Sequence, residues 1–312
     1  MERVLVTGGA GFIGSHLVRA LLVRGDDVLV LDDLSTGARA NLAGLPAELL
    51  VADLDDADQV RAATRGADAV FHLGAMISVP ASLENPAGCY RTNVLGSLHV
   101  LEAARREQVR RVVLASSCAV YGDHDGPVGE GAAPRPMSPY AQSKLAMEDL
   151  ARLYTSAFAL ATVCLRFFNV YGPRQDVHSP YAAVIPLFIR GLLDGRPPTI
   201  YGDGAQSRDF VFVEDVVQAI LLAAAAPAGG ETFNVAQGTS ATIVELAEAL
   251  RRLVPGSPGP VFGPARPGDI RTSAADIRRA TEALGYRPAC DLHRGLQATV
   301  EWMRARRGPA PA

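Results

Sequence analysis

The sequence predicts an α/β protein in which helices cover both faces of a doubly wound parallel sheet, with a smaller, irregular α/β region towards the C-terminus. Three observations lead to this prediction. Apolar segments of strand length recur through the first half, segments with helical periodicity separate them, and Pro and Gly become frequent only after about residue 170. Strands that are apolar on both faces and alternate with helices are typical of parallel sheets built by right-handed crossovers.

The strands are predicted from apolar runs that are too short for helices. They lie at residues 3–8, 27–33, 48–54, 68–74 and 111–117, and residues 161–172 predict a further strand of the same sheet. Helical periodicity is plain at 12–25 and 93–108.

The second half reads as a looser region that caps the sheet. Helical patterns at 213–226 and 242–254 lie between Pro- and Gly-rich segments, of which 255–268 is the expected mobile loop. We expect the chain to return to the sheet at about residues 210–236.

Composition excludes several classes of protein. The net charge of −3 over 312 residues argues against nucleic acid or an anionic membrane surface as partners. The longest apolar run is too short to span a bilayer, and the N-terminus enters a strand-like segment at once, without a signal peptide. The four cysteines are widely scattered, which predicts neither a zinc site nor disulfides and suits a reducing cytoplasm. We therefore expect a cytoplasmic protein without a metal.

The first strand runs into a glycine-rich turn that predicts a dinucleotide site. Gly8, Gly11 and Gly14 recur at intervals of three, directly after a strand and at the start of a helix. Glycine there permits a tight turn, close approach of a pyrophosphate to the backbone, and packing of helix on strand. The helix N-terminus offers free N–H groups to the phosphates. The context thus favours a Rossmann-type dinucleotide fold over a plain glycine turn.

Acidic residues after the next strands predict which dinucleotide binds. Asp32 follows the glycines by about 20 residues, where a carboxylate accepts hydrogen bonds from the adenosine ribose and repels a 2′-phosphate. We therefore predict NAD rather than NADP. Asp32 could instead hold its own loop, Asp33 could take its role, and Asp53 could either lie near the adenine or cap a helix. The cofactor site is further assigned Phe12, Ile13, Leu54, Leu73 and Ala75.

Tyr140 and Lys144 lie four residues apart in a predicted helix, so that both share one face. A lysine charge beside the phenol would lower its pKa and make it a base for a sugar or alcohol hydroxyl. Such a pair is also common by chance. Ser116 and Ser117 strengthen the catalytic interpretation, because they end the fifth strand at the edge where parallel sheets bind ligands. Only one of the two serines needs to be functional.

Together these segments resemble the extended short-chain dehydrogenase/reductase family. The resemblance rests on "TGGAGFIG", "SSCAVYG", "YAQSK", "RFFNVYGPR" and "RDFVFVEDV", which occur in the right order over nearly the whole chain. It is strongest to the nucleotide-sugar 4-epimerases, the UDP-glucose 4-epimerase group. This implies that Ser117, Tyr140 and Lys144 form the catalytic set, that NAD is tightly held, and that the sugar passes through a 4-keto intermediate.

The resemblance also implies the substrate residues. Asn169 matches a substrate-binding asparagine, Arg208 and Arg266 match arginines that bind the diphosphate, and Asp269 matches the carboxylate that holds the nucleotide ribose. Ser273 stands where a bulky tyrosine is associated with hexoses that lack an N-acetyl group, so we expect UDP-GlcNAc and UDP-GalNAc to fit alongside UDP-glucose and UDP-galactose. Each arginine could instead be a surface charge. Asn93 could line the same cleft or serve in helix packing.

Departures from related enzymes narrow the function. Sugar-nucleotide 4,6-dehydratases carry Asp-Glu after the strand-five hydroxyl, whereas this chain has Cys118-Ala119. Asn169 and Asp176 argue against a uronate substrate. Cys118 could act as the acid or base of a 3,5-epimerase, or simply fill buried space. A reductase and a non-catalytic dinucleotide-binding regulator also stay open.

The predicted organisation follows from these assignments. The NAD-binding domain comprises residues 1–170 plus about 210–236, and the substrate-binding domain comprises 171–209 and 237–312. The helices around 84–107 and 139–158 resemble those that pair between subunits in this family, which implies a homodimer. The same apolar pattern would also suit burial on the sheet.

Overall fold

The computed structural model describes residues 1–124, 126–177, 183–227, 229–265 and 271–307. A seven-stranded parallel sheet forms its centre, in the order β12-β7-β5-β4-β1-β2-β3. The strands are β1 (Arg3–Thr7), β2 (Asp27–Asp32), β3 (Glu48–Val51), β4 (Ala69–His72), β5 (Arg111–Ser117), β7 (Thr162–Phe167) and β12 (Glu231–Val235). The predicted doubly wound sheet is confirmed.

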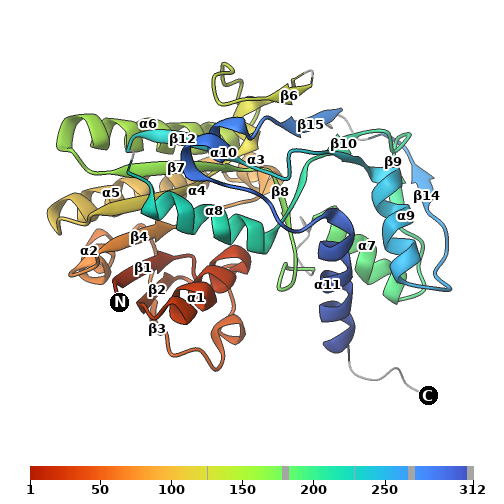
Figure 1. Ribbon diagram of the computed structural model, residues 1–312, viewed down its shortest axis with the longest axis horizontal. Helices are drawn as coiled ribbons and strands as arrows, with labels where there is room; N and C mark the ends of the chain where they lie inside the picture. Colours follow the sequence, from red (N-terminus) through yellow and green to blue (C-terminus); the bar gives the residue numbers. More distant parts are fainter. Residues whose placement is uncertain (125, 178–182, 228, 266–270, 308–312) are drawn as a thin grey trace.

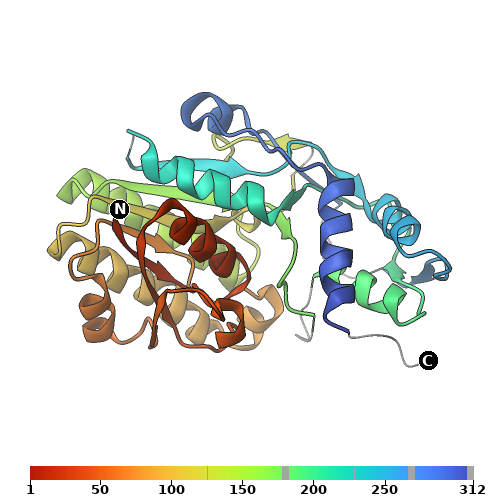
Figure 2. The ribbon, with the colours of Figure 1, turned by 60° about the horizontal axis from the view of Figure 1, so that its bottom comes forward.

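Helices cover both faces of this sheet (Figures 1 and 2). One face carries α1 (Phe12–Arg24), α8 (Val213–Ala225) and α10 (Arg278–Leu284), whose apolar side chains share a core with β1, β7 and β12. The other face carries α2 (Ala57–Thr64), α5 (Gly96–Arg106) and α6 (Pro139–Phe158), with a second core. Strands buried on both faces explain why their sequences are continuously apolar rather than alternating.

Short elements connect these layers. They are the 3₁₀ turns Arg39–Leu42 and Cys118–Tyr121, the helices α3 (Val79–Glu84) and α4 (Pro86–Tyr90), and a π-helical segment at Arg91–Leu95. The chain continues from this π-helical segment directly into α5.

The prediction of a single strand over residues 161–172 is wrong in part. The segment divides into β7, in the central sheet, and β8 (Asn169–Tyr171), which pairs instead with β11 (Phe210–Phe212). Phe168 separates them, and its N–H donates to the carbonyl of Val235. The chain thus leaves the central sheet at Phe168 and carries Asn169 into the second lobe.

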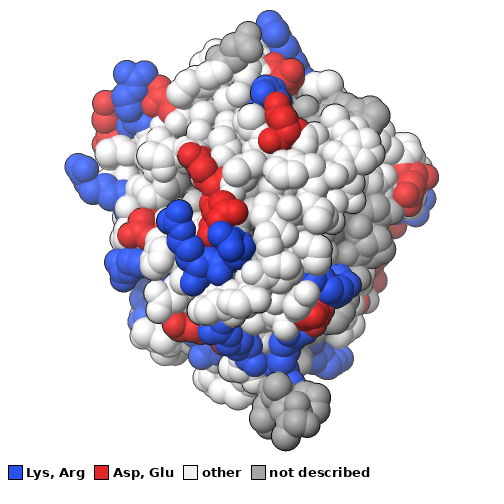
Figure 3. Space-filling view, turned by 90° about the vertical axis from the view of Figure 1, so that its right-hand side faces the viewer, with Lys and Arg blue, Asp and Glu red and all other residues white. Residues whose placement is uncertain are grey.

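The second lobe contains α7 (Val184–Leu193), α9 (Ile243–Leu253) and α11 (Leu292–Ala305), which share a third core. A four-stranded sheet β13-β10-β15-β6 comprises Ala241–Thr242, Ser207–Arg208, Thr272–Ala275 and Pro127–Val128. A two-stranded sheet pairs β14 (Val261–Gly263) with β9 (Thr199–Tyr201). On the face of this lobe in Figure 3, basic and acidic side chains are interspersed beside a broad uncharged area.

The chain returns to the central sheet within residues 210–236, through α8 and β12. The division into two domains stays a prediction. The packing of α10 against β12 and α8 leads us to propose that this helix belongs with the central sheet rather than with the substrate region.

Within the described ranges, no helix is long and apolar enough to cross a bilayer. The four cysteines, all of them described, are free thiols.

Candidate active site

The glycine-rich turn has the geometry that its sequence predicts. Gly8 has φ +70°, a left-handed conformation that favours glycine. A Cβ on Gly14 would lie 2.1 Å from the Gly8 carbonyl oxygen, so α1 can start this close to β1 only with glycine at that position. Phe12 and Ile13 form the first turn of α1. The turn thus presents the N-terminus of α1 at the carboxyl edge of the sheet, an arrangement that fits a pyrophosphate.

Asp32 ends β2 beside this turn and holds it in place. Its two carboxylate oxygens accept backbone hydrogen bonds from Ala10 and Leu34, both at 2.9 Å. Burial raises the pKa of Asp32, and these two hydrogen bonds act in the opposite direction. Asp32 therefore holds its own loop, which is the alternative to a role in ribose binding alone. Each oxygen keeps a second lone pair that can accept a ribose hydroxyl, so the binding role stays a prediction. Asp33 is exposed and bonds to Ser35.

The other residues that the sequence assigns to the cofactor follow β3 and β4 at the same edge of the sheet. Asp53 is exposed and accepts from the Asp55 N–H, while Asp56 is the residue that caps α2. The helix-capping alternative for Asp53 is thus wrong. Leu54 is buried next to it. Leu73 and Ala75 flank Gly74, whose N–H donates to the Thr7 hydroxyl at 3.1 Å. Parallel strands end at one edge, which brings these segments together.

Tyr140 lies in the first turn of α6, as its sequence predicts. Ser138 caps this helix by accepting the Ala141 N–H, and Pro139 takes the first helical position. The Tyr140 N–H donates to the Ser82 hydroxyl at 3.1 Å, which ties the helix start to α3. The phenol interacts with Ser117 at the end of β5, and this interaction acts to lower the pKa of Tyr140. The structure therefore brings a phenol and a hydroxyl together at the ligand-binding edge.

The two serines at the end of β5 point to different partners. Ser117 is half-buried, and its Oγ also accepts the Ala119 N–H at 3.2 Å. Ser116 is buried and donates to Glu148 at 2.5 Å. Ser117, rather than Ser116, is therefore the serine beside the phenol.

The electrostatic part of the sequence prediction is wrong. Burial raises the pKa of Tyr140 to about 12, and the hydrogen bond with Ser117 opposes it only partly. The Lys144 ammonium donates instead to the Ala115 carbonyl at 2.8 Å. Burial lowers the pKa of Lys144 to about 8. Lys144 thus neighbours the phenol along the helix without lowering its pKa. It is also the only lysine of the sequence; the other 29 basic residues are arginine.

The substrate residues that the structure describes lie in the second lobe. Arg208 in β10 is the register partner of Ser273 in β15. Asn169 in β8 pairs with Phe210 of β11, two residues after Arg208. The Asn169 amide donates to the Asp209 carbonyl at 3.0 Å. Arg266 and Asp269 lie outside the described residues.

Asn169 and Arg208 line a cavity of about 300 Å³. Its other walls include residues that the sequence did not single out, among them Gln175, Val184, Phe188 and Tyr201. The Gln175 Oε1 is buried and has no hydrogen-bond partner among the described residues. These residues come from two separate elements, α7 and β9, and from the segment after β8, so no local pattern could have marked them.

The structure bears on the roles of Asn93 and Cys118. Asn93 is buried and bonds to Met76 and Ser143, which favours the packing role over the cleft. Burial raises the pKa of the Cys118 thiol to about 12, with Asp209 acting in the same direction. A thiol held neutral in this way suits the role of a small apolar filler.

Among the described residues, no group of three His, Cys, Asp or Glu side chains could hold a metal ion.

Comparison with known proteins identifies relatives of this chain. Residues 4–236 match the model of the NAD dependent epimerase/dehydratase family. The UDP-glucose 4-epimerase of Mycolicibacterium smegmatis is 42% identical over 309 residues, which cover 97% of this chain and 98% of that protein.

Two solved structures superpose over nearly the whole chain. A UDP-N-acetylglucosamine 4-epimerase from Methanobrevibacter ruminantium, in complex with UDP-N-acetylmuramic acid, is 39% identical with a TM-score of 0.94, covering 98% of this chain and 99% of that one. A UDP-glucose 4-epimerase from Thermus thermophilus, in complex with NAD, is 39% identical with a TM-score of 0.89, covering 97% and 99%. NAD is thus the cofactor, and the glycine turn and Asp32 fit it.

Gly14→Ala tests the glycine turn as the cofactor site. The added Cβ would meet the Gly8 carbonyl oxygen at 2.1 Å, so the turn must open and lose its fit to the pyrophosphate. We expect purified variant protein to retain roughly tenfold less NAD than wild type, which is a loss of about 1.4 kcal/mol in binding. Absorbance of the denatured supernatant measures it. Gly131→Ala, where a Cβ meets no atom within 4 Å, is the control. Equal NAD content in both variants would contradict the assignment.

Proposed function

Because this chain belongs to the NAD dependent epimerase/dehydratase family, we propose that it is a UDP-hexose 4-epimerase. It interconverts UDP-glucose and UDP-galactose, and also their N-acetyl forms. One observation carries the proposal: Ser117 at the end of β5 and Tyr140 in the first turn of α6 meet at the carboxyl edge of the same sheet that presents the glycine turn. A base placed beside the cofactor edge suits oxidation of a sugar hydroxyl. Epimerase relatives at about 40% identity support the reaction class.

Tyr140 is the group that removes the proton from the sugar 4-hydroxyl. Ser117 hydrogen-bonds the phenol oxygen and thereby favours its charged form. Because burial alone keeps the phenol neutral, a positive charge is needed nearby. When bound, NAD⁺ would supply such a charge in its nicotinamide ring and would serve as acceptor and donor of the hydride at C4. Lys144, one helical turn along, holds a cofactor ribose.

The assigned residues divide between the two ligands. Gly8, Gly11 and Gly14 approach the pyrophosphate, and Asp32 accepts the adenosine ribose hydroxyls. Phe12, Ile13, Asp33, Asp53, Leu54, Leu73 and Ala75 border the cofactor. Arg208 binds the sugar-nucleotide diphosphate, since a guanidinium fork matches phosphate oxygens. Asn169 lies beside it in the cavity wall. Arg266 and Asp269 complete this set in the proposal.

The residues after Ser117 disfavour the rival activities. Elimination of water from C5–C6 needs an acid and a base, and this chain places Cys118 and Ala119 there. A 3,5-epimerase would need Cys118 to exchange a proton, which a thiol with a pKa of about 12 does poorly. The intact Ser117, Tyr140 and Lys144 set argues against a regulator without catalysis.

Purified protein incubated with UDP-glucose, without added NAD, tests the function. We expect UDP-galactose to accumulate until equilibrium is reached. Proton NMR of the anomeric signals resolves the two epimers and measures their ratio. Tyr140→Phe keeps the ring but removes the base, so turnover should fall by about 10²-fold or more while NAD content stays unchanged. A wild-type protein that interconverts neither UDP-glucose/UDP-galactose nor their N-acetyl forms would refute the proposal. Unchanged turnover in the variant would refute the role of Tyr140.

Ser273→Tyr tests the size of the sugar pocket. Ser273 pairs in register with Arg208, so a larger side chain there would extend beside the diphosphate arginine. We expect kcat/KM for UDP-GlcNAc to fall by about tenfold or more, while that for UDP-glucose changes little. Thr272→Tyr, at the preceding residue of β15, is the matched control. Equal losses for both sugars would remove Ser273 from the specificity assignment.

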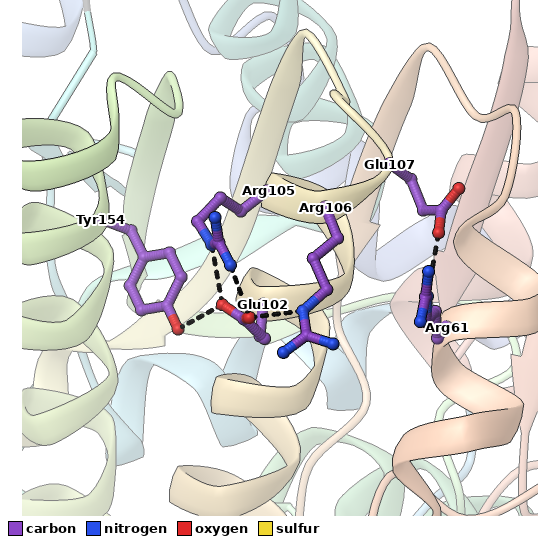
Figure 4. Close-up of polar contacts among 6 residues, drawn as sticks. All are labelled: Arg61, Glu102, Arg105, Arg106, Glu107 and Tyr154. Atoms are coloured by element: carbon purple, nitrogen blue, oxygen red, sulfur yellow. Dashed lines mark hydrogen bonds and ion pairs between the residues drawn. The ribbon is translucent and has the colours of Figure 1, made fainter.

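We further propose a homodimer that forms through α5 and α6. Glu102 of α5 accepts hydrogen bonds from Arg105, Arg106 and Tyr154, which fixes α5 against α6 (Figure 4). These two helices, together with the π-helical segment Arg91–Leu95 that leads into α5, expose large apolar side chains. They are Leu95 (40% exposed), Leu153 (54%) and Phe158 (50%). Exposed apolar groups gathered on neighbouring helices mark an interaction surface.

Leu153→Glu tests this surface. A buried, unpaired carboxylate would weaken dimerisation by about tenfold or more, which sedimentation velocity measures as a shift to monomer. Val23→Glu changes an equally apolar and 85% exposed residue on α1, on the opposite face of the sheet, and should leave the dimer intact. A wild-type protein that is monomeric throughout would contradict the proposal.

A further inference from the structure

Helix α6 carries a third polar residue in line with Tyr140 and Lys144. Glu148 follows Lys144 by four positions, as Lys144 follows Tyr140, so the three side chains lie along one stripe of the helix. Each meets a successive residue at the end of β5. Lys144 donates to the Ala115 carbonyl, Glu148 accepts from the Ser116 hydroxyl, and Tyr140 interacts with Ser117. Glu148 is therefore part of the contact that places the two catalytic elements against each other.

Glu148 is fully buried and doubly bound to Arg166. The Arg166 Nε lies 2.9 Å from Oε1 and its Nη2 lies 2.6 Å from Oε2, a bidentate pair whose side chains are 0% and 5% exposed. Arg166 belongs to β7, where it is the register partner of Ser116. Its guanidinium stacks on the ring of Tyr121 at 4.7 Å. Glu148 thus joins α6 to adjacent positions of two strands.

Stability alone is a poor reason for such a pair. A buried ion pair contributes little net stability, because desolvation of both charges offsets their attraction, and apolar replacements are often as stable. The position of the Glu148–Arg166 pair within the site is the more informative observation. The pair lies directly under the strand end that carries Ser117, and one helical turn from Lys144.

Lys144 is surrounded by groups that are mostly neutral. Burial lowers its pKa to about 8, while Cys89 on α4, Cys164 on β7 and Glu148 act in the opposite direction. Burial raises the pKa of Cys164 far above its ordinary value, and lowers that of His72 on β4 to about 3, so both are uncharged near neutral pH. Glu148, one helical turn from Lys144, is the carboxylate among these groups, and its charge is paired with that of Arg166.

We propose that Glu148 is a positioning residue for the epimerase reaction, which keeps Lys144 in its ammonium form and holds the end of β5 beneath Tyr140. The inference rests on the proposed function. Glu148 touches neither sugar nor cofactor, and it acts through Lys144 and Ser116. Its expected signature is a change in the pH dependence of catalysis, whereas a purely structural residue would change stability alone.

The single lysine permits a direct measurement. Protein grown with lysine labelled with ¹³C at Cε gives one side-chain resonance, that of Lys144, whose shift reports its protonation. In Glu148→Gln the amide can still accept the Ser116 hydrogen bond, but the negative charge is gone. We expect the titration midpoint of Lys144 to move to lower pH by roughly one unit. This readout does not depend on turnover.

The pH dependence of kcat should follow the titration of Lys144. If the titration midpoint of Lys144 falls by about one unit from near 8, kcat of Glu148→Gln should stay within about twofold of wild type at pH 6.5. At pH 9 it should be about tenfold lower than that of wild type. KM for the UDP-sugar should stay unchanged. Asp149→Asn removes the same charge from the next residue of α6, whose side chain is 61% exposed, and should alter neither the NMR titration nor the pH profile.

A second variant covers the case in which Glu148→Gln does not fold because Arg166 is left unpaired. Glu148→Gln combined with Arg166→Met removes both charges, and the Lys144 midpoint should still lie below that of wild type. A wild-type midpoint in the folded variants would overturn the proposal, as would an unchanged alkaline limb of kcat. If wild-type protein shows no epimerisation at all, the proposed function fails, whereas an unchanged Lys144 titration refutes only the role of Glu148.

Discussion

The attachment of α6 to the end of β5 is the contact on which the rest of the site depends. Tyr140 can meet Ser117 only if the first turn of α6 lies over the carboxyl edge of the sheet. Three polar contacts in consecutive positions of β5 hold it there, through Ala115, Ser116 and Ser117. The start of the helix is tied separately to α3 through Ser82. Preorganisation of this kind lets a side chain act without reorganisation at the moment of reaction.

Burial sets the protonation states within this contact. The same desolvation raises the pKa of Tyr140 to about 12 and lowers that of Lys144 to about 8. Each shift favours the neutral form, so an active site that uses a phenolate and an ammonium must counter both. Ser117 opposes the first shift, and Cys89, Cys164 and Glu148 oppose the second. The polar groups around the pair thus have an electrostatic purpose besides their geometric one.

The two lobes contribute different parts of the site because the chain leaves the central sheet at Phe168. That break places Asn169 in β8 beside β11, and β11 directly follows Arg208 and Asp209. The Asp209 carbonyl then accepts both the backbone N–H and the side-chain amide of Asn169. The cavity in the second lobe is therefore built by pairing between segments about 40 residues apart.

The sequence by itself determined the features that follow from local rules. Alternating apolar runs and helical periods predicted the parallel sheet, the intervals between Gly8, Gly11 and Gly14 predicted the turn, and Ser138-Pro139 stands where α6 begins. These depend on sterics and hydrogen bonds within a few residues of each other.

Only the tertiary structure decided where the polar side chains point. It directed Lys144 to Ala115, buried Asn93, engaged both oxygens of Asp32 with backbone, and set Ser117 rather than Ser116 beside Tyr140. The partners of Lys144 and Ser116 lie 29 and 32 residues away along the chain. A buried charge or hydroxyl takes whichever partner the packing brings within hydrogen-bonding distance, and no local pattern specifies that choice.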